Sequence, residues 1–370
     1  MTTRKRILII DNSTGWTGAF KSIVTVAQYL SGVFDFYFSI PSNSSNRQFL
    51  NDRKIPYQEL NFIEISKRLP ALLYPFQLIL NAVRIKRYCK RNGIDIVHVN
   101  DIYNLTGIVV KLLRPKTKLI YHIRLLESSY ARAFYKTWIR LISRFADNLV
   151  TVSQSAKADA VKYTQKSILV IHDCIDGRPL LNKRADTSSV MFLYLANYTP
   201  GKGHDIAIKS FAHVYRQNAT VRMIMAGGDL GVTANKIYKR SLSEHIANEG
   251  LSDVIEMRGF EPDIHKIMSE CDVFLNFSAS ESFSMTCLEA IMNGKPVIAT
   301  ASGGPAEIVK HDYCGLIIPV GDVRAAADAM LQLAGDAYKR DYFCKNAIRQ
   351  AEENFNLEIE AAKLSAIYNA

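Results

Sequence analysis

Short apolar segments of strand length alternate with helix-length segments along the whole chain, and this alternation restricts the fold more than any other feature. We expect strands at residues 6–11, 34–40, 94–100, 118–123, 149–153, 168–171, 190–196, 221–226, 254–257, 272–277, 296–300 and 315–319. Apolar strands separated by roughly 10–20 residues of helical pattern indicate βαβ units and parallel sheets. A chain of 370 residues exceeds one comfortable hydrophobic core, so the sequence predicts two doubly wound α/β domains.

A polar interval from Asp173 to Ser189 separates the two series of strands. We therefore place a first domain at residues 1–175, a linker at 176–189 and a second domain at 190–351. The remaining residues, 352–370, contain no strand and are expected to form a C-terminal helix.

The cysteines and the first residues of the chain indicate the cellular compartment of the protein. The six cysteines are scattered without C-x-x-C spacing, which is typical of reduced thiols in a cytoplasm-like compartment. The first apolar run, Ile7 to Ile10, directly follows basic residues and is too short for the apolar region of a signal peptide. The sequence therefore predicts a cytoplasmic protein.

The positive charge of the chain is confined to its first half. Residues 1–180 carry 27 Lys and Arg against 12 Asp and Glu, a net charge of +15, whereas residues 181–370 carry 19 against 23, a net charge of −4. A partner with dense negative charge is therefore expected to meet the first half. Nucleic acid and an anionic membrane surface are the two candidates.

Two segments combine this basic charge with apolar residues. Residues 69–83 are mostly apolar and precede a basic run formed by Arg84, Lys86, Arg87, Lys90 and Arg91. Residues 130–145 carry a basic side chain at every fourth position: Arg132, Lys136, Arg140 and Arg144. Helices of this kind bind anionic headgroups, but their apolar faces also suit packing on a sheet, and both interpretations stay open. At fifteen residues, 69–83 is too short to span a bilayer.

Residues 278–307 hold the strongest indication of chemistry. Glu281 comes just before an expected helix at 285–292, Glu289 lies inside that helix, and Glu307 follows a Gly303-Gly304 turn. A helix start offers unpaired N–H groups and partial positive charge, which suit a phosphate, and a carboxylate accepts hydrogen bonds from sugar hydroxyls. The segment therefore favours a ligand with both phosphate and hydroxyl groups, such as a nucleotide-sugar.

This segment resembles the donor-site motif of retaining GT-B glycosyltransferases of family 4, in which two glutamates are separated by seven residues. The flanking residues agree as well: Asp272, Leu288-Glu289-Ala290, Gly294-x-Pro296-Val297 and Gly303-Gly304-x-x-Glu307. The resemblance implies two Rossmann-like domains facing a cleft, retaining transfer from a UDP- or GDP-sugar, and a C-terminal helix that crosses back to the first domain.

The resemblance also assigns roles to donor-site residues. Glu289 would bond the ribose hydroxyls, Glu281 would contact the transferred sugar, and the phosphate would lie at the start of the helix. Donor contacts there are expected from Ser284, Met285 and Thr286, and loops at Gly228 and Gly259 would lie beside the nucleotide.

Lys202 follows a strand and a Pro-Gly turn, where its charge can neutralise a diphosphate. It matches the lysine of the family. Asn197 stands where the family usually has an arginine. The set of basic side chains expected to hold the diphosphate is therefore one positive charge short.

In the first domain, Gly18 closes a loop that the family uses to line the cleft from the acceptor side. His122, at the end of a strand, resembles the family histidine that faces the donor sugar and supports the developing oxocarbenium ion. Arg124 shares its strand face and is in a position to assist. We interpret His98 as an ordinary core histidine.

The sequence contains no D-x-D motif, so we expect neither a metal nor another cofactor. The expected acceptor is a lipid-linked or polysaccharide-precursor glycan, with the protein peripheral on the inner face of an anionic membrane and not bound to nucleic acid. Two alternatives remain: another GT-B enzyme, such as a nucleotide-sugar epimerase, and a basic nucleic-acid-binding protein. The second does not explain the three glutamates, and nothing in the sequence indicates the oligomeric state.

Overall fold

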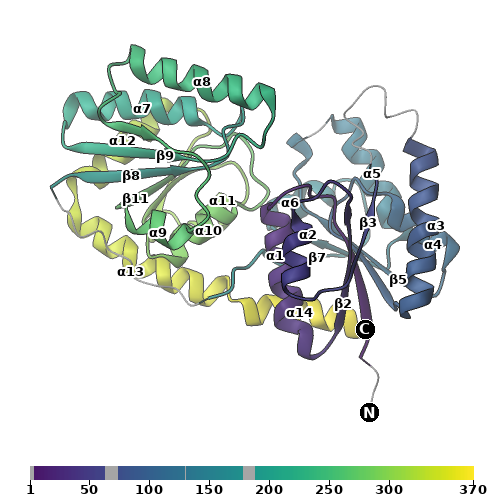
Figure 1. Ribbon diagram of the computed structural model, residues 1–370. Helices are drawn as coiled ribbons and strands as arrows, with labels where there is room; N and C mark the ends of the chain where they lie inside the picture. Colours follow the sequence, from purple (N-terminus) through teal and green to yellow (C-terminus); the bar gives the residue numbers. More distant parts are fainter. Residues whose placement is uncertain (1–3, 63–73, 130, 178–187) are drawn as a thin grey trace. The chain divides into compact units, whose positions relative to one another are not determined.

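The structure is a computed structural model that describes residues 4–62, 74–129, 131–177 and 188–370. The chain divides into two compact units, which are described separately (Figure 1). Unit 1 comprises Met1–Ile175 together with Leu357–Ala370, and unit 2 comprises Asp176–Asn356. Most of the predicted linker, 176–189, lies outside the described residues.

Unit 1 is built on a parallel sheet of seven strands in the order β3-β2-β1-β4-β5-β6-β7. The strands are β1 (Arg6–Ile10), β2 (Asp35–Pro41), β3 (Tyr57–Leu60), β4 (Ile96–Val99), β5 (Lys118–Ile123), β6 (Asn148–Thr151) and β7 (Ile168–Val170). Its helices are α1 (Gly18–Tyr29), α2 (Asn46–Asp52), α3 (Tyr74–Asn92), α4 (Thr106–Leu113), α5 (Arg132–Phe145), α6 (Gln154–Ala160) and α14 (Leu357–Asn369).

Hydrophobic clusters cover both faces of this sheet. One cluster joins the sheet to α3, α4 and α5, and the other joins it to α1 and α14. Strands buried on both faces must be continuously apolar, which explains runs such as Ile7 to Ile10.

Unit 2 has a parallel sheet of six strands in the order β10-β9-β8-β11-β12-β13. The strands are β8 (Val190–Leu195), β9 (Val221–Ala226), β10 (Ile255–Met257), β11 (Val273–Asn276), β12 (Val297–Thr300) and β13 (Gly315–Ile318). Its helices are α7 (His204–Gln217), α8 (Thr233–Asn248), α9 (Ile264–Ser269), α10 (Met285–Met292), α11 (Pro305–Ile308), α12 (Val323–Gly335) and α13 (Ala337–Asn354).

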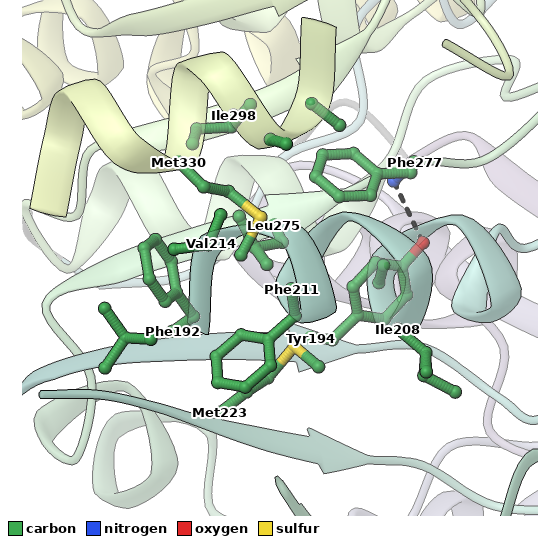
Figure 2. Packing of buried hydrophobic residues seen from close by; sticks show 14 of the residues in the cluster. Phe192, Tyr194, Ile208, Phe211, Val214, Met223, Leu275, Phe277, Ile298 and Met330 are labelled. Atoms are coloured by element: carbon green, nitrogen blue, oxygen red, sulfur yellow. Dashed lines mark hydrogen bonds between the residues drawn. The ribbon is translucent and has the colours of Figure 1, made fainter. Parts of the chain in front are cut away.

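The core of unit 2 joins the sheet to α7 and α12. Phe211 of α7 and Met330 of α12 are fully buried against Phe192 and Leu275 of the strands (Figure 2). Tyr194 lies in the same cluster, but its hydroxyl reaches the end of the sheet and accepts a hydrogen bond from the Phe277 amide at 2.9 Å. The core thus extends directly into the loops at the carboxyl ends of the strands.

The prediction of two doubly wound α/β domains is confirmed, and every predicted strand is present with ends that agree to within two residues. The sequence analysis missed β3. This strand reads Tyr-Gln-Glu-Leu, without an apolar run, because it lies at the sheet edge and pairs only with β2.

The C-terminal helix α14 packs on unit 1 beside α1 (Figure 1). Its last carbonyls accept hydrogen bonds from two lysines: Lys5 donates to Tyr368 and Asn369 at 3.0 and 2.8 Å, and Lys118 donates to Ile367. Cations at this end of a helix complement the negative end of its dipole. The end of α14 is therefore fixed against the sheet.

Within the described parts of the chain, no helix is both long and apolar enough to cross a membrane. This includes α3, although residues 69–73 of the apolar segment expected there lie outside the described residues.

Candidate active site

The predicted donor-site residues of unit 2 lie at the carboxyl edge of its sheet, in loops that follow β8, β9, β10 and β11 and in helix α10, which begins directly after the last of these loops. Ligands of doubly wound sheets bind at this edge, because the loops there connect strand ends to helix starts.

Lys202 and Glu281 form the centre of this group. The Lys202 ammonium lies 2.6 Å from Glu281 Oε1, and the Ser278 hydroxyl donates to the same oxygen at 2.9 Å. Both charged side chains are partly exposed, so a ligand can reach them. The structure thus brings together the lysine that is expected to bind phosphate and the glutamate that is expected to bind sugar hydroxyls.

Lys202 is positioned by the close approach of its loop to β11. The next residue, Gly203, has a φ of +78°, and a Cβ there would lie 2.1 Å from the Phe277 carbonyl oxygen. Only glycine fits this position. The Tyr194 hydroxyl, which accepts from the Phe277 amide, donates to the Lys202 carbonyl and thereby joins the two loops.

Glu281 is held by the loop after β12. Its amide donates to the Ser302 carbonyl at 3.0 Å, and its carbonyl accepts from the Gly304 amide at 2.9 Å. A Cβ at Gly304 would lie 2.2 Å from Phe283 Cα. The Gly303-Gly304 turn seen in the sequence therefore serves to let this loop pass close to the glutamate segment.

Helix α10 begins at this same point. Ser284 is its N-cap residue, with a φ of 89° that side chains rarely adopt, and its hydroxyl accepts from the Cys287 amide at 3.4 Å and the Asn276 side chain at 3.0 Å. These bonds stabilise the strained backbone. Met285 and Thr286 form the first turn, whose amides have no carbonyl partner within a helix and suit an anion.

Glu289 lies one turn further along α10 and is only 6% exposed. The carboxylate is therefore largely shielded from water in the interior of unit 2. In such surroundings a hydrogen bond to a carboxylate is stronger than in water.

Asn197, Gly228 and Gly259 connect the neighbouring loops. The Asn197 side-chain oxygen accepts from the Gly228 amide at 3.2 Å, and the Gly227 amide donates to the Gly259 carbonyl at 3.0 Å. Where the family usually has an arginine, the asparagine thus ties two loops together. Sequence reasoning missed Lys239 of α8, whose ammonium lies 4.6 Å from the Tyr198 ring centre and brings positive charge to these loops.

The unit 1 candidates lie in two places. Gly18 is the first residue of α1, which is capped by Thr17. His122 lies near the end of β5 and is only 3% exposed. Both residues belong to unit 1, which is described separately from the unit 2 group.

The contacts of His122 define its tautomer. Its Nδ1 lies 3.4 Å from an Arg124 guanidinium nitrogen, which can only donate, so the ring proton is on Nε2. That Nε2–H is buried and has no hydrogen-bond partner among the described residues. Burial, then Arg124 and His98, hold the pKa of His122 well below its usual value. The ring is therefore a neutral donor with an unused N–H group.

A buried polar network surrounds Arg124. Its guanidinium pairs with Asp173 at 2.5 Å and donates to the Asn100 side chain at 2.7 Å, and Asn100 donates to Asp11 at 2.5 Å. Asp173 opens the polar interval that the sequence analysis took to separate the domains, yet it is buried in unit 1. Burial, and then Asp11, raise the pKa of the adjacent Asp101 to about 8.

Family profiles identify the class of the protein. "Glycosyl transferases group 1" matches residues 182–350, and "Glycosyltransferase Family 4" matches residues 36–177. Together they span most of the chain, which belongs to the group 1, family 4 glycosyltransferases with the GT-B fold.

Individual relatives are distant. The lipopolysaccharide core biosynthesis mannosyltransferase LpsB of Rhizobium meliloti is 29% identical over 171 residues, which are 46% of this chain and about half (48%) of that protein. A Campylobacter jejuni N-acetylgalactosaminyltransferase is 21% identical, with 94% of this chain and 95% of the relative covered. Among solved structures, Anabaena HepE with UDP and glucose has a TM-score of 0.84 at 20% identity, covering 99% and 100% of the two chains.

We expect Asp173→Asn to lower the free energy of unfolding of unit 1 by about 3–5 kcal/mol, because the variant leaves the buried Arg124 charge without its counter-ion. Both tryptophans, Trp16 and Trp138, lie in unit 1, so urea unfolding followed by tryptophan fluorescence reports on this unit.

The control is Glu59→Gln, which removes the exposed pair between Arg47 and Glu59 in the same unit and should cost less than about 1 kcal/mol. Equal effects of the two variants would contradict the buried network.

Proposed function

We propose that the protein is a retaining, metal-independent glycosyltransferase that moves a sugar from a UDP- or GDP-sugar to a lipid-linked or polysaccharide-precursor acceptor at a membrane surface. The observation that carries the proposal is the pairing of Lys202 with Glu281 beside the start of α10.

In this proposal the donor replaces the contact between Lys202 and Glu281. The diphosphate carries more negative charge than a carboxylate, so the Lys202 ammonium moves to it, with the first amides of α10 completing the site. Glu281 then accepts from hydroxyls of the transferred sugar, and Glu289 accepts from the ribose. The neighbour HepE, solved with UDP, supports a nucleoside diphosphate in this role.

The transfer itself follows a front-face route. The leaving phosphate oxygen helps to deprotonate the acceptor hydroxyl, so the anomeric configuration is retained. The unused Nε2–H of His122 donates to a sugar hydroxyl while positive charge develops on the ring carbon. Lys202 and the helix dipole stabilise the leaving group, which a divalent metal would otherwise do.

A lipid-linked acceptor agrees with two observations. The Campylobacter relative is named for a diphospho-undecaprenol-linked acceptor. In unit 1, α3 exposes Phe76, Ile79 and Leu80, with Phe76 at 74%, and its second half carries exposed basic residues: Arg84, Lys86, Arg87, Lys90 and Arg91. An exposed apolar group beside basic side chains is typical of a surface that docks on anionic lipid.

A basic groove lies on the same side of the sheet as α3, because α3, α4 and α5 pack on one face. It has a volume of about 640 Å³, and its charged lining residues are Arg140, Arg144 and Lys166. Arg132, expected in the same basic row, instead pairs with Glu127 at 3.1 Å. We assign Arg140, Arg144 and Lys166 to anionic headgroups, and Arg132 to the local structure.

We expect Lys202→Ala and Glu289→Gln each to weaken nucleotide-sugar binding about tenfold to a hundredfold, because each loses a charged hydrogen bond of roughly 1.5–3 kcal/mol. Thermal-shift screening against UDP, GDP and ADP selects the nucleotide, and calorimetry with the matching sugar measures affinity. The control is Lys209→Ala on the exposed side of α7, which should bind as the wild type does. Unchanged affinity in both site variants would refute the assignment.

The product should keep the anomeric configuration of the donor, and turnover should persist after treatment with EDTA. An NMR time course of the anomeric proton checks the first point, and activity after chelation checks the second. An inverted product anomer, or complete dependence on added Mg²⁺ or Mn²⁺, would exclude the proposed route.

Replacing Arg140, Arg144 and Lys166 by glutamine should weaken binding to anionic vesicles about a hundredfold, since each contributes about 1 kcal/mol near such a surface. Liposome co-sedimentation at low and high salt measures this, with phosphatidylglycerol-rich and neutral vesicles. The matched control replaces three exposed cations of unit 2, Lys209, Lys236 and Arg324. Equal binding by the two triple variants, or equal binding to neutral vesicles, would contradict docking through the groove.

A further inference from the structure

The ring of His122 is stacked on a second buried histidine. His98 of β4 lies next to it on the same face of the sheet, with ring centres 5.6 Å apart and an angle of 21° between the planes. Desolvation, and then Arg124, lower the pKa of His98 to about 3. Both rings are therefore neutral, and each limits the rotation of the other.

His98 is in turn held by the last helix of the chain. Its Nδ1 lies 2.7 Å from the hydroxyl of Tyr368, which is 270 residues away in sequence. This is the only hydrogen bond that either ring nitrogen of His98 makes among the described residues, since its Nε2 has no partner there. Without the phenol, no other described group would fix the plane of the His98 ring through a hydrogen bond.

Tyr368 itself cannot move easily. Its ring is fully buried in edge contacts with Phe34 and Phe36, at 5.4 and 6.2 Å between ring centres. The phenol is thus presented to His98 from a fixed position.

We propose that Tyr368 is a positioning residue for the active site: its hydroxyl fixes the His98 ring, and the His98 ring holds the stacked His122 with its Nε2–H directed to the donor sugar. The proposal rests on the proposed sugar-binding role of His122. The C-terminal segment, residues 357–370, would then carry the hydroxyl that positions the His122 ring on β5. In this way α14 would contribute to the chemistry.

Tyr368→Phe tests this step, because it removes one oxygen and keeps the buried ring. We expect kcat to fall about threefold to tenfold, the range for one weakened neutral hydrogen bond. Affinity for the nucleoside diphosphate alone should not change, because no group that binds it is altered. In long-range ¹H–¹⁵N spectra, the His98 Nδ1 signal should lose its hydrogen-bonded shift, and the His122 signals should move and broaden as the stacked His98 ring loses its fixed plane.

Two further variants separate positioning from simple stability. Lys5→Met removes bonds to the end of α14 without touching the rings, so it should lower the melting temperature while leaving the His122 signals and kcat unchanged. His98→Gln keeps a polar partner for the phenol but removes the stacked ring, so it should lower kcat as Tyr368→Phe does. It also provides a second test if Tyr368→Phe folds poorly.

Unaltered His122 signals in both Tyr368→Phe and His98→Gln would overturn the proposal, as would the same spectral change in Lys5→Met. If the signals move as expected but His122→Ala turns over normally, the positioning link stands and the sugar-binding role of His122 fails. The spectra thus distinguish failure of this inference from failure of the proposed function.

Discussion

The Tyr194 hydroxyl holds together the two loops on which the candidate active site is built. It donates to the Lys202 carbonyl and accepts from the Phe277 amide, while Gly203 lets the two backbones approach. Because Tyr194 belongs to the core of unit 2, the rigidity of that core extends to the loop that carries Lys202. The contact between Lys202 and Glu281 depends on this arrangement, and so does the proposed exchange of the glutamate for a diphosphate.

In unit 1 the candidate residues are organised by the buried charge of Arg124 and not by a contact between two loops. Arg124 is surrounded by Asp173, Asn100 and His122, and its pairing with Asp173 keeps a buried cation at the carboxyl edge of the sheet. That cation has two effects on His122: it adds to burial, the larger cause, in keeping the pKa of the ring low, and it places the proton on Nε2. In the proposed transfer, a neutral donor next to the developing positive charge would avoid the repulsion that an imidazolium would cause.

The sequence predicted most of the fold because strands that are buried on both faces consist of continuous apolar residues. The prediction missed β3 because an edge strand needs no such run. Lys202 and Glu281 were predicted from glycine turns, from spacing and from the resemblance to the family motif, which are local signals. Their mutual contact joins residues 79 positions apart and has no local signal.

Asp173 looks like any residue of a polar connection, and His98 was interpreted as an ordinary core histidine. Neither the ion pair with Arg124 nor the bond from Tyr368 can be read from a pattern along the chain.

The central claim is that the start of α10 binds the diphosphate of a nucleotide. Hydrogen exchange of the full chain with and without UDP, GDP and ADP tests it most directly. For at least one nucleotide, the account predicts slower exchange in a peptide covering Met285, Thr286 and Cys287, together with one containing Lys202. A single-stranded oligonucleotide should leave both peptides unchanged. Protection of neither peptide by any of the three nucleotides, or protection of unit 1 by the oligonucleotide alone, would contradict the account.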